Sequence, residues 1–189
     1  YHQRLTNLIK AGISLSPLLI PLKTIEEVAN IARETLQARF TFVTMLDQEG
    51  SFSRTASSGN APRLLKSLNK NPIEDTTIRA ALYAYEAFRV RDIRKYSKAS
   101  HIEIDHNGLR SLLAIPIRLH RLSIGAILAF GKQGEIFFSE NDESLAGLLS
   151  SQAANAIEST WLYQELRSTL RTTTQLYNLS VDIIMAEEL

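Results

Sequence analysis

The 189-residue sequence contains no cysteine. This absence excludes a disulfide, a thiolate nucleophile, a thiolate-bound metal and a chromophore attached through a thioether bond. No apolar run approaches the roughly 20 residues needed to cross a membrane, and the chain does not open with a signal peptide. We therefore expect a cytoplasmic domain that makes no contact with a membrane.

An excess of charge of one sign is also missing. Lysine and arginine number 21, aspartate and glutamate number 20, and the formal net charge is +1. Proteins that bind nucleic acids or anionic membranes usually carry a clear basic surface. Neither is an expected partner here. The hydrophobic content of 44% and charged content of 22% are instead typical of a folded globular domain.

Catalytic motifs are missing as well. The serines have no accompanying His–Asp pattern, no pair of carboxylates is framed by a helix or strand signal, and no glycine-rich phosphate loop is present. The sequence therefore predicts a domain that is not an enzyme.

The strongest structural signal is a pair of apolar segments, Leu112–Leu119 and Leu122–Phe130, separated only by His120-Arg121. Their composition and tight connection predict a central antiparallel hairpin. Pro116 lacks an N–H, so we expect a bulge or an unpaired position there. Gly125 is expected to let a helix approach the sheet closely.

Before this hairpin, the pattern alternates between helices and strands. Tyr1–Leu15 carries a narrow apolar stripe at helical spacing. Thr24-x-x-Glu27 has the form of a capping box and predicts a helix to about Arg39. Its expected inner face is Ile25, Val28, Ala29, Ala32 and Leu36. A strand, a turn and a more polar strand should follow over Phe40–Leu46, Asp47–Gly50 and Ser51–Ser57.

The middle of the chain predicts two short helices, a strand and a loop. The helices are expected over Ala61–Lys70, with Leu64, Leu65 and Leu68 inward, and over Thr77–Glu86, capped by Asp75 or Thr76. Phe88–Ile93 has the composition of a strand. Arg94–Gly108 is polar with weak periodicity, which favours a loop that contains a helical turn.

A long helix is expected from Ser139 onward. Ser139 can cap it, and three acids in its first turn complement the positive end of the helix dipole. The expected buried stripe is Leu145, Leu148, Leu149, Gln152, Ala153, Ala156 and Ile157. The pattern then continues near heptad spacing through Trp161, Tyr163, Leu166, Leu170, Tyr177 and Ile184. β-branching in Thr172–Thr174 lowers helix propensity and weakens the seam, which makes this run a candidate joint.

The residues from the hairpin onward resemble the GAF domain family. LLAIPIRLHRLSIGAILAF is similar to the family's strand–turn–strand, FSENDESLAGLLSSQAANAIE resembles its exit helix, and Trp161-Leu162-Tyr163 resembles its aromatic continuation. The resemblance implies an α+β fold with a six-stranded antiparallel sheet. The terminal helices would cover one face, and a pocket with short helices would occupy the other. Such modules occur in histidine kinases, nucleotide cyclases, phosphodiesterases and transcription regulators.

The resemblance also implies a division of the chain into three parts. We expect a linker helix over residues 1–20, a GAF-like domain over 21–158, and an exit helix over 159–189 that leads to an output domain. The terminal helices are the expected interface of a homodimer, and a small molecule is the expected effector.

Some family ligands are restricted by the sequence. Nucleotide-binding members carry Asn-Lys, then Phe, three residues and Asp-Glu; here Lys132, Phe138, Asp142 and Glu143 match, but Gly131 replaces the Asn. Helix capping alone also explains a Phe followed by acids at a helix start. Cyclic nucleotide is therefore an unfavoured alternative. Covalent bilin attachment and the chemistry of free methionine sulfoxide reductases both need cysteine, which is absent.

His101 and His106, with Glu103 and Asp105 between them, form the one cluster that resembles a metal or haem site. A spacing of five residues places the two rings on different faces of a helix or a strand. We therefore favour a solvated loop over a metal site. Haem held by a single histidine is left as an unfavoured alternative.

The expected pocket lies beside Phe88–Asp92, Arg94–Gly108 and Ser111–Ile115. Arginine offers a planar fork for carboxylate or phosphate, although an ordinary salt bridge is the simpler role for Arg89, Arg91 and Asp92. Strand alternation is taken to direct Ser111 toward the pocket and Ala114, Gly125 and Ala126 toward the helices. The predicted ligand-binding residues are Arg91, Asp92, His106, Ser111, Leu113 and Ile115.

Two functions are compatible with these expectations. The first is a sensory and regulatory domain that binds a small molecule and relays its presence through the terminal helices. The second is a ligand-free dimerisation scaffold between the domains of a kinase or cyclase. An enclosed cavity with converging Arg91 and Ser111 would favour the first function. A region filled by Ile102, Ile104, Leu113 and Ile115 would favour the second.

Overall fold

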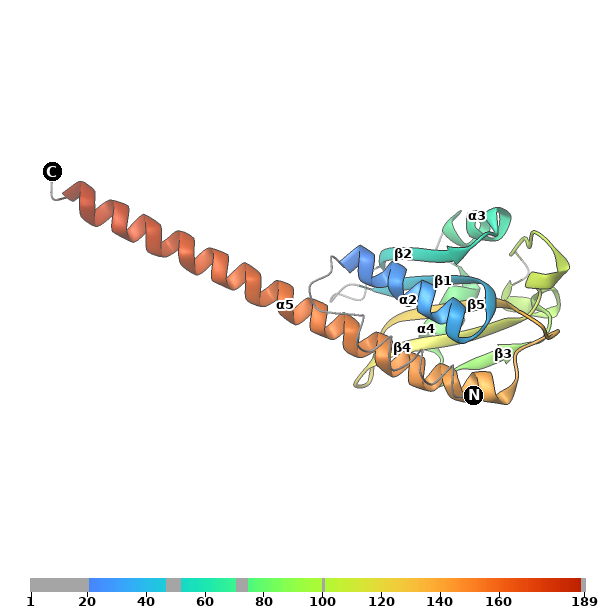
Figure 1. The fold of residues 1–189 in the computed structure, drawn as a ribbon. Helices are drawn as coiled ribbons and strands as arrows, with labels where there is room; N and C mark the ends of the chain where they lie inside the picture. The colour runs from blue at the N-terminus through green and yellow to red at the C-terminus, as the bar shows by residue number, and fades with distance from the viewer. Residues whose placement is uncertain (1–20, 47–51, 71–74, 100, 188–189) are drawn as a thin grey trace.

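The structure is a computed structural model that describes residues 21–46, 52–70, 75–99 and 101–187 (Figure 1). The predicted helix Tyr1–Leu15 and turn Asp47–Gly50 lie outside the described residues. Along the described part of the chain, no helix has an apolar stretch long enough to span a membrane.

The described residues form a five-stranded antiparallel sheet and its covering helices, whereas six strands were predicted. The strand order is β2-β1-β5-β4-β3. The elements in chain order are α2 (Pro21–Thr35), β1 (Ala38–Leu46), β2 (Phe52–Gly59), α3 (Pro62–Lys70), α4 (Thr76–Tyr83), β3 (Phe88–Val90), the 3₁₀ turns η1 (Ile93–Lys95), η2 (Ser97–Ala99) and η3 (Asn107–Leu109), β4 (Leu112–Leu119), β5 (Leu122–Lys132) and α5 (Glu140–Glu187).

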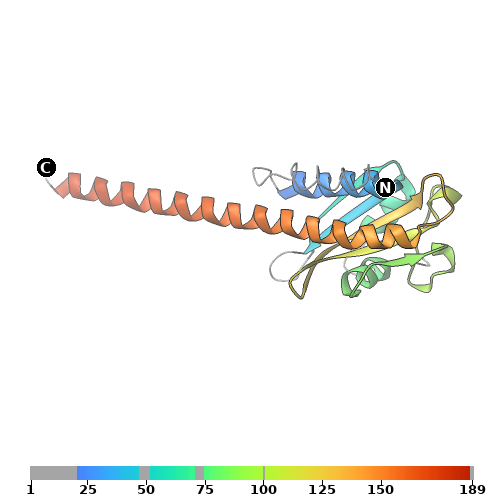
Figure 2. The ribbon, with the colours of Figure 1, turned by 60° about the horizontal axis from the view of Figure 1, so that its bottom comes forward.

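The helices lie in two layers, one on each side of the sheet (Figures 1 and 2). Helices α2 and α5 cover one face, which we call the long-helix face. Helices α3 and α4, with the 3₁₀ turns, cover the opposite, short-helix face. Each face carries its own cluster of buried apolar side chains. This arrangement confirms the predicted α+β fold class.

Helix α2 has the predicted inner face, since Ile25, Val28, Ala29 and Ala32 are buried; Leu36, which directly follows the end of the helix, is buried as well. The predicted helix start is wrong. The helix begins at Pro21, a residue suited to the first helical position because it lacks the N–H that would have no partner there. Thr24 therefore lies within the first turn and is not the cap of a capping box.

The central hairpin has the predicted bounds in β4, and β5 extends two residues further, to Lys132. Pro116 faces Ala126 of β5 in regular register, and the bulge falls one step later, between Ile117 and Arg118. On the other side, β3 ends its pairing at Ala114. The missing N–H of Pro116 therefore points to an open edge, where no ladder bond is lost. The Pro116 carbonyl accepts a hydrogen bond from Ser150 of α5.

Gly125 permits a close approach, but the neighbour is a strand and not the predicted helix. A Cβ on Gly125 would lie 2.5 Å from the Thr44 carbonyl oxygen and 2.7 Å from the Met45 sulfur, both on β1. The glycine thus allows β1 and β5 to pair closely.

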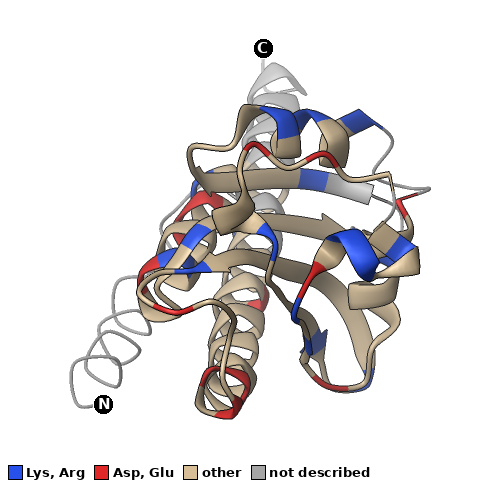
Figure 3. Cartoon of the chain, turned by 90° about the vertical axis from the view of Figure 1, so that its right-hand side faces the viewer, with Lys and Arg blue, Asp and Glu red and all other residues tan. Residues whose placement is uncertain are grey.

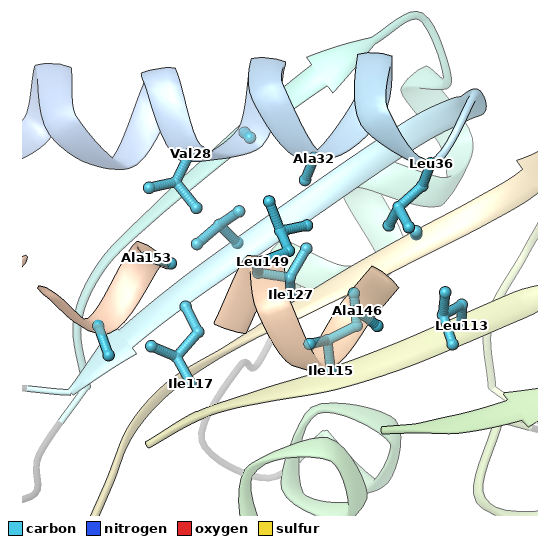
Figure 4. Close-up of a cluster of buried hydrophobic side chains, with 14 of the residues drawn as sticks. Val28, Ala32, Leu36, Leu113, Ile115, Ile117, Ile127, Ala146, Leu149 and Ala153 are labelled. Carbon is cyan, nitrogen blue, oxygen red and sulfur yellow. The ribbon is translucent and has the colours of Figure 1, made fainter. Parts of the chain in front are cut away.

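The predicted facing of β4 is reversed. Leu113, Ile115 and Ile117 face α2 and α5 (Figure 4), whereas Ala114 and Ala126 belong to the short-helix face. The cause is that both faces of these central strands are buried. Without a polar face, apolar alternation carries no information on which side is which.

Helix α5 is one unbroken helix of 48 residues, as the continuous apolar pattern predicts. Its first half packs on the sheet through Leu145, Leu149 and Ala153 (Figure 4). Leu148 was predicted in this buried stripe, but its exposed fraction is 51%. The second half extends away from the sheet (Figure 1). It carries exposed apolar side chains, namely Leu162, Tyr163, Leu166, Leu170 and Tyr177.

Candidate functional site

A pocket of about 550 Å³ opens on the short-helix side, between α4, the start of β3 and the turns that follow it. We call it the α4 pocket. It is lined by Thr76, Arg79, Ala80, Tyr83, Ala84, Phe88, Tyr96 and Lys98. It therefore adjoins two of the three segments predicted to border the ligand site, those around Phe88 and in Arg94–Gly108.

Polar bonds at the start of α4 fix the walls of this pocket. Asp75 caps the helix, accepting hydrogen bonds from the backbone N of Thr77 at 2.8 Å and of Ile78 at 2.9 Å. Its other carboxylate oxygen lies 2.7 Å from Nε2 of His101. The hydroxyls of Thr76 and Thr77 both donate to the Lys98 carbonyl. The start of α4 and turn η2 are thus tied together on either side of the opening.

Aromatic rings supply the apolar part of the lining. The rings of Phe88 and Tyr96 pack at 6.3 Å between centroids with a tilt of 54°. The guanidinium carbon of Arg79 lies 6.0 Å from the centre of the Tyr83 ring, one helical turn away. Burial raises the pKa of Tyr96, so its phenol remains a neutral hydrogen-bond donor at physiological pH.

The six residues predicted to bind the ligand do not surround the α4 pocket. Arg91 stacks on the Phe137 ring at 4.9 Å. Asp92 accepts from the Arg94 backbone N at 3.1 Å and pairs with the Arg94 guanidinium at 2.6 Å. That side-chain hydrogen bond lowers the pKa of Asp92 to about 2. Asp92 thus caps η1 and ends the predicted strand Phe88–Ile93 after Val90.

The other four predicted residues also have structural partners. His106 caps η3 through Nδ1, which accepts from the Gly108 N at 3.1 Å. Ser111 is buried, and its hydroxyl accepts from the Lys132 N at 3.4 Å. Leu113 and Ile115 lie in the apolar cluster of the long-helix face. The converging pair of Arg91 and Ser111 is therefore not formed, and the ligand-binding role of these six residues stays a prediction.

Sequence reasoning missed the residues of the α4 pocket. Arg79 and Tyr83 are spaced four apart, which places them on one side of a helix, and this signal was available. Phe88 was placed in a strand beside the expected pocket but was not named among the ligand-binding residues. Tyr96 and Lys98 lie in an irregular loop, for which sequence periodicity gives no direction.

His101 and His106, the two histidines of the loop after β3, make separate contacts. His101 bonds to Asp75 and His106 caps η3. Within the described ranges, no group of three or more His, Asp or Glu side chains is arranged to hold a metal ion.

Lys132, Phe138 and Asp142, three of the four residues that match the nucleotide-binding motif, form a buried cluster. Nζ of Lys132 donates to Asp142 Oδ1 at 2.8 Å and to the Leu36 carbonyl at 3.0 Å. The other oxygen of Asp142 accepts from the N and Oγ of Ser139 at 2.8 and 2.9 Å. Nζ also lies 6.0 Å from the Phe138 ring centre. This set fastens β5 to the first turn of α5, and the bonds between Ser139 and Asp142 are the helix capping that the sequence allowed.

Opposing effects act on the Asp142 carboxyl group. Burial by itself would raise its pKa, but the hydrogen bonds from Lys132 and Ser139 and the charge of Lys132 outweigh burial and lower the pKa. Asp142 therefore remains ionised, as the buried ammonium group of Lys132 requires.

Arg89 forms a second tie between the sheet and α5. Its Nε pairs with Glu143, its Nη2 lies 3.6 Å from Glu140, and its Nη1 donates to the Phe138 carbonyl at 3.4 Å. Arg89 follows Phe88 directly on β3, so the two side chains point to opposite faces of the sheet. In Figure 3 the first turn of α5 is the acidic segment at the bottom of the domain.

A larger concavity of about 660 Å³, the α5 groove, lies on the other side of β3. Its two arginines already bond within the protein. Arg89 is held by the glutamates of α5, and Arg118 donates to the carbonyls of Ala84 and Arg121 at 3.2 and 2.7 Å. The α4 pocket, whose cations are not bonded in this way, is therefore the better candidate for a ligand.

The sequence model of one family, described as GAF domain, matches residues 23–158. None of the curated proteins matches the sequence. Among solved structures, the GAF domain of a phosphoenolpyruvate-protein phosphotransferase from Coxiella burnetii aligns with a TM-score of 0.65. The alignment has 16% identity and covers 86% of this chain and 96% of that chain.

Two other similar structures contain a bound small molecule. Free methionine-R-sulfoxide reductase from Neisseria meningitidis, in complex with its substrate, aligns with a TM-score of 0.60 and 15% identity over 82% of this chain and 89% of that one. The phycoerythrobilin-bound GAF domain of a cyanobacterial phytochrome gives a TM-score of 0.59 and 16% identity over 85% and 97%. At these identities the structural likeness establishes the fold alone.

Proposed function

The chain belongs to the GAF domain family of sensory and regulatory domains, and we propose that it binds a small molecule in the α4 pocket and relays occupancy through α5. One observation carries the proposal. Phe88, a wall of the α4 pocket, is directly followed on β3 by Arg89, which pairs with the first turn of α5. Two adjacent residues of β3 therefore connect the pocket to the long helix.

The relay would work through the shortness of β3. This strand has three residues and pairs with β4 on one side only, so few bonds resist its displacement. A ligand that pushes on Phe88 would move Arg89 and change its pairing with Glu143. Packed helices respond to such changes by switching between discrete arrangements rather than by bending continuously.

The proposed role is binding rather than catalysis. The lining of the α4 pocket contains no histidine or carboxylate that could serve as a general acid or base. We propose no reaction for this domain.

A second copy of this chain is the proposed partner of α5. Tyr163, Leu166, Leu170, Thr173 and Tyr177 follow one another at alternating spacings of three and four residues. This is the heptad pattern of a coiled-coil seam. Leu166 and Leu170 have exposed fractions of 58% and 59%, so the seam is uncovered in a single chain. A parallel homodimer would bury it and would carry the relay to an output domain.

The relay is tested by amide hydrogen exchange of the whole chain. Small molecules released on denaturation are identified by mass spectrometry, with absorption spectroscopy to detect haem, and exchange is compared before and after stripping. We expect occupancy to slow exchange both at β3 and over the first turns of α5. In Arg89→Gln, the response at β3 should remain and the response at α5 should be lost. An unchanged α5 response in this variant would refute the proposed path.

The dimer is tested by sedimentation. Leu166→Glu with Leu170→Glu places charges in the seam and should convert a dimer to a monomer. Gln164→Glu with Arg171→Glu adds the same side chains outside the seam and should leave the dimer intact. A wild-type chain that stays monomeric at high micromolar concentration would contradict the proposed interface.

A ligand-free scaffold is the second candidate, and one observation favours it. The short-helix face is filled by buried apolar side chains, among them Phe40, Phe42 and Phe130, against which Ile102 and Ile104 also pack. Leu113 and Ile115 belong to the other cluster, so the predicted filling by all four residues does not occur. A chain that dimerises but yields no bound molecule and no exchange response would support the scaffold.

A further inference from the structure

The cations of the α4 pocket differ from those around it. Lys132 pairs with Asp142, Arg89 with Glu143 and Arg94 with Asp92. Arg79 and Lys98 line the pocket, and within the described residues neither side chain has an ion-pair partner.

The pocket lining also lacks a compensating negative charge. None of its eight residues is acidic. Asp75, the neighbour of Thr76 in sequence, is buried and already bonds to two backbone N–H groups and His101. Tyr96 adds no negative charge, because a phenol is neutral at physiological pH and burial raises its pKa further. The pocket therefore has two positive charges that a ligand could neutralise.

The apolar part of the lining is aromatic. Phe88 and Tyr96 form a fixed pair of rings, and Tyr83 remains 76% exposed although it is a large aromatic residue. Aromatic walls favour flat ring systems, which stack in offset or edge-to-face arrangements. A volume of about 550 Å³ is in the range of small-molecule sites.

From this combination we infer that the α4 pocket binds a small aromatic carboxylate, with the ring between the aromatic walls and the carboxylate held by Arg79 and Lys98. The inference rests on the proposed function, because it takes the α4 pocket as the ligand site. The cations are well placed for the task. Arg79 lies one helical turn from Tyr83, and the carbonyl of Lys98 is anchored to α4 by Thr76 and Thr77.

The probes are 2-naphthoate, its neutral analogue 2-naphthamide, and acetate, titrated into the stripped full chain by calorimetry. We expect 2-naphthoate to bind in a saturable manner with one site per chain. The amide should bind at least about tenfold more weakly, because a hydrogen bond to a charged group contributes more than a neutral one. Acetate lacks the ring and should not bind at the same concentrations.

Variants separate the charge from the ring. Arg79→Gln with Lys98→Gln should weaken 2-naphthoate by about tenfold or more and leave 2-naphthamide unchanged. Tyr96→Leu should weaken both probes. Lys95→Gln removes an exposed lysine from the same loop and is the matched control, which should bind like the wild type. Arg79 and Lys98 are exposed, so their replacement should leave the fold intact.

The outcomes distinguish this inference from the proposed relay. Equal affinity for the naphthoate and the amide, unchanged naphthoate binding in the double variant, or no binding of any probe overturns the ligand class. Charge-selective binding supports it. If 2-naphthoate binds as expected but exchange at α5 does not respond, the ligand class stands and the relay is refuted.

Discussion

The pairs Lys132–Asp142 and Arg89–Glu143 both fasten the first turn of α5 to the sheet. The first joins it to β5, and both of its side chains are fully buried. The second joins it to the edge strand β3, and its side chains are 32% and 36% exposed. The buried pair is reinforced by the Leu36 carbonyl and by Ser139, whereas Arg89 shares its charge with Glu140 as well.

This difference makes the Lys132–Asp142 pair an anchor of α5 and the Arg89–Glu143 pair a contact that can be broken and re-formed. Breaking a buried pair leaves a charge in a medium of low polarity, which is costly. An ion pair at the surface exchanges for water at little cost. Helix α5 can therefore stay attached through β5 while its contact with β3, and so with the α4 pocket, is made or released.

The largest expected effect is that of Lys132→Met, which breaks the buried pair. This variant removes the Lys132 ammonium group that donates to Asp142 Oδ1 and to the Leu36 carbonyl, and it leaves the buried charge of Asp142 without its counter-ion. The free energy of unfolding should fall by about 3–5 kcal/mol, measured by urea denaturation. Adding Asp142→Leu should restore much of the loss, because no buried charge then remains. A loss below about 1 kcal/mol would place this pair in the same class as a surface salt bridge.

Acid should weaken the anchor in a way that identifies Asp142. Its folded pKa is lowered, so its contribution to stability is complete above the unfolded value of about 3.9 and is lost as pH falls through the folded pKa. Wild type should therefore exceed Asp142→Asn in stability near neutral pH, with the difference shrinking below about pH 4. Asp92 titrates in the wild type and in the variant alike, so its contribution cancels in the stability difference between the two proteins.

A stability difference that does not vary with pH would contradict this assignment. The loss would then come from the geometry of the asparagine rather than from the charge of Asp142.

The residues of the Lys132–Asp142 anchor could be recognised in the sequence, but their contact with the Leu36 carbonyl could not be predicted. Lys132, Phe138 and Asp142 were recognised as part of a motif, and helix capping was given as the simpler explanation of the phenylalanine and the acid. That Lys132 reaches the Leu36 carbonyl, 96 residues away in sequence, follows from the packing of α2 against β5. No local pattern predicts such a contact.

The fold was largely predictable because its elements have strong periodic signals. The inner face of α2, the bounds of β4 and the continuity of α5 follow from hydrophobic spacing. The facing of β4 does not, because a strand buried on both sides has no polar face to set its direction. Two segments beside the α4 pocket were predicted, but its lining residues were not, because Tyr96 and Lys98 come from irregular turns whose position is set by the threonines of α4.

The smallest expected effect, and the finest test of the comparison, concerns Arg89 and Glu143. In a double-mutant cycle of Arg89→Gln and Glu143→Gln, the coupling energy should be about 1 kcal/mol or less, as for other exposed pairs. It should decline further near 1 M salt, where the screening length falls to about 3 Å. The Lys132–Asp142 pair, cycled in parallel, should keep its coupling because solvent ions do not reach it. A salt-insensitive coupling of several kcal/mol at Arg89 would make β3 a second anchor. Helix α5 could then not be released from the edge strand, and the α4 pocket would have no means of moving it.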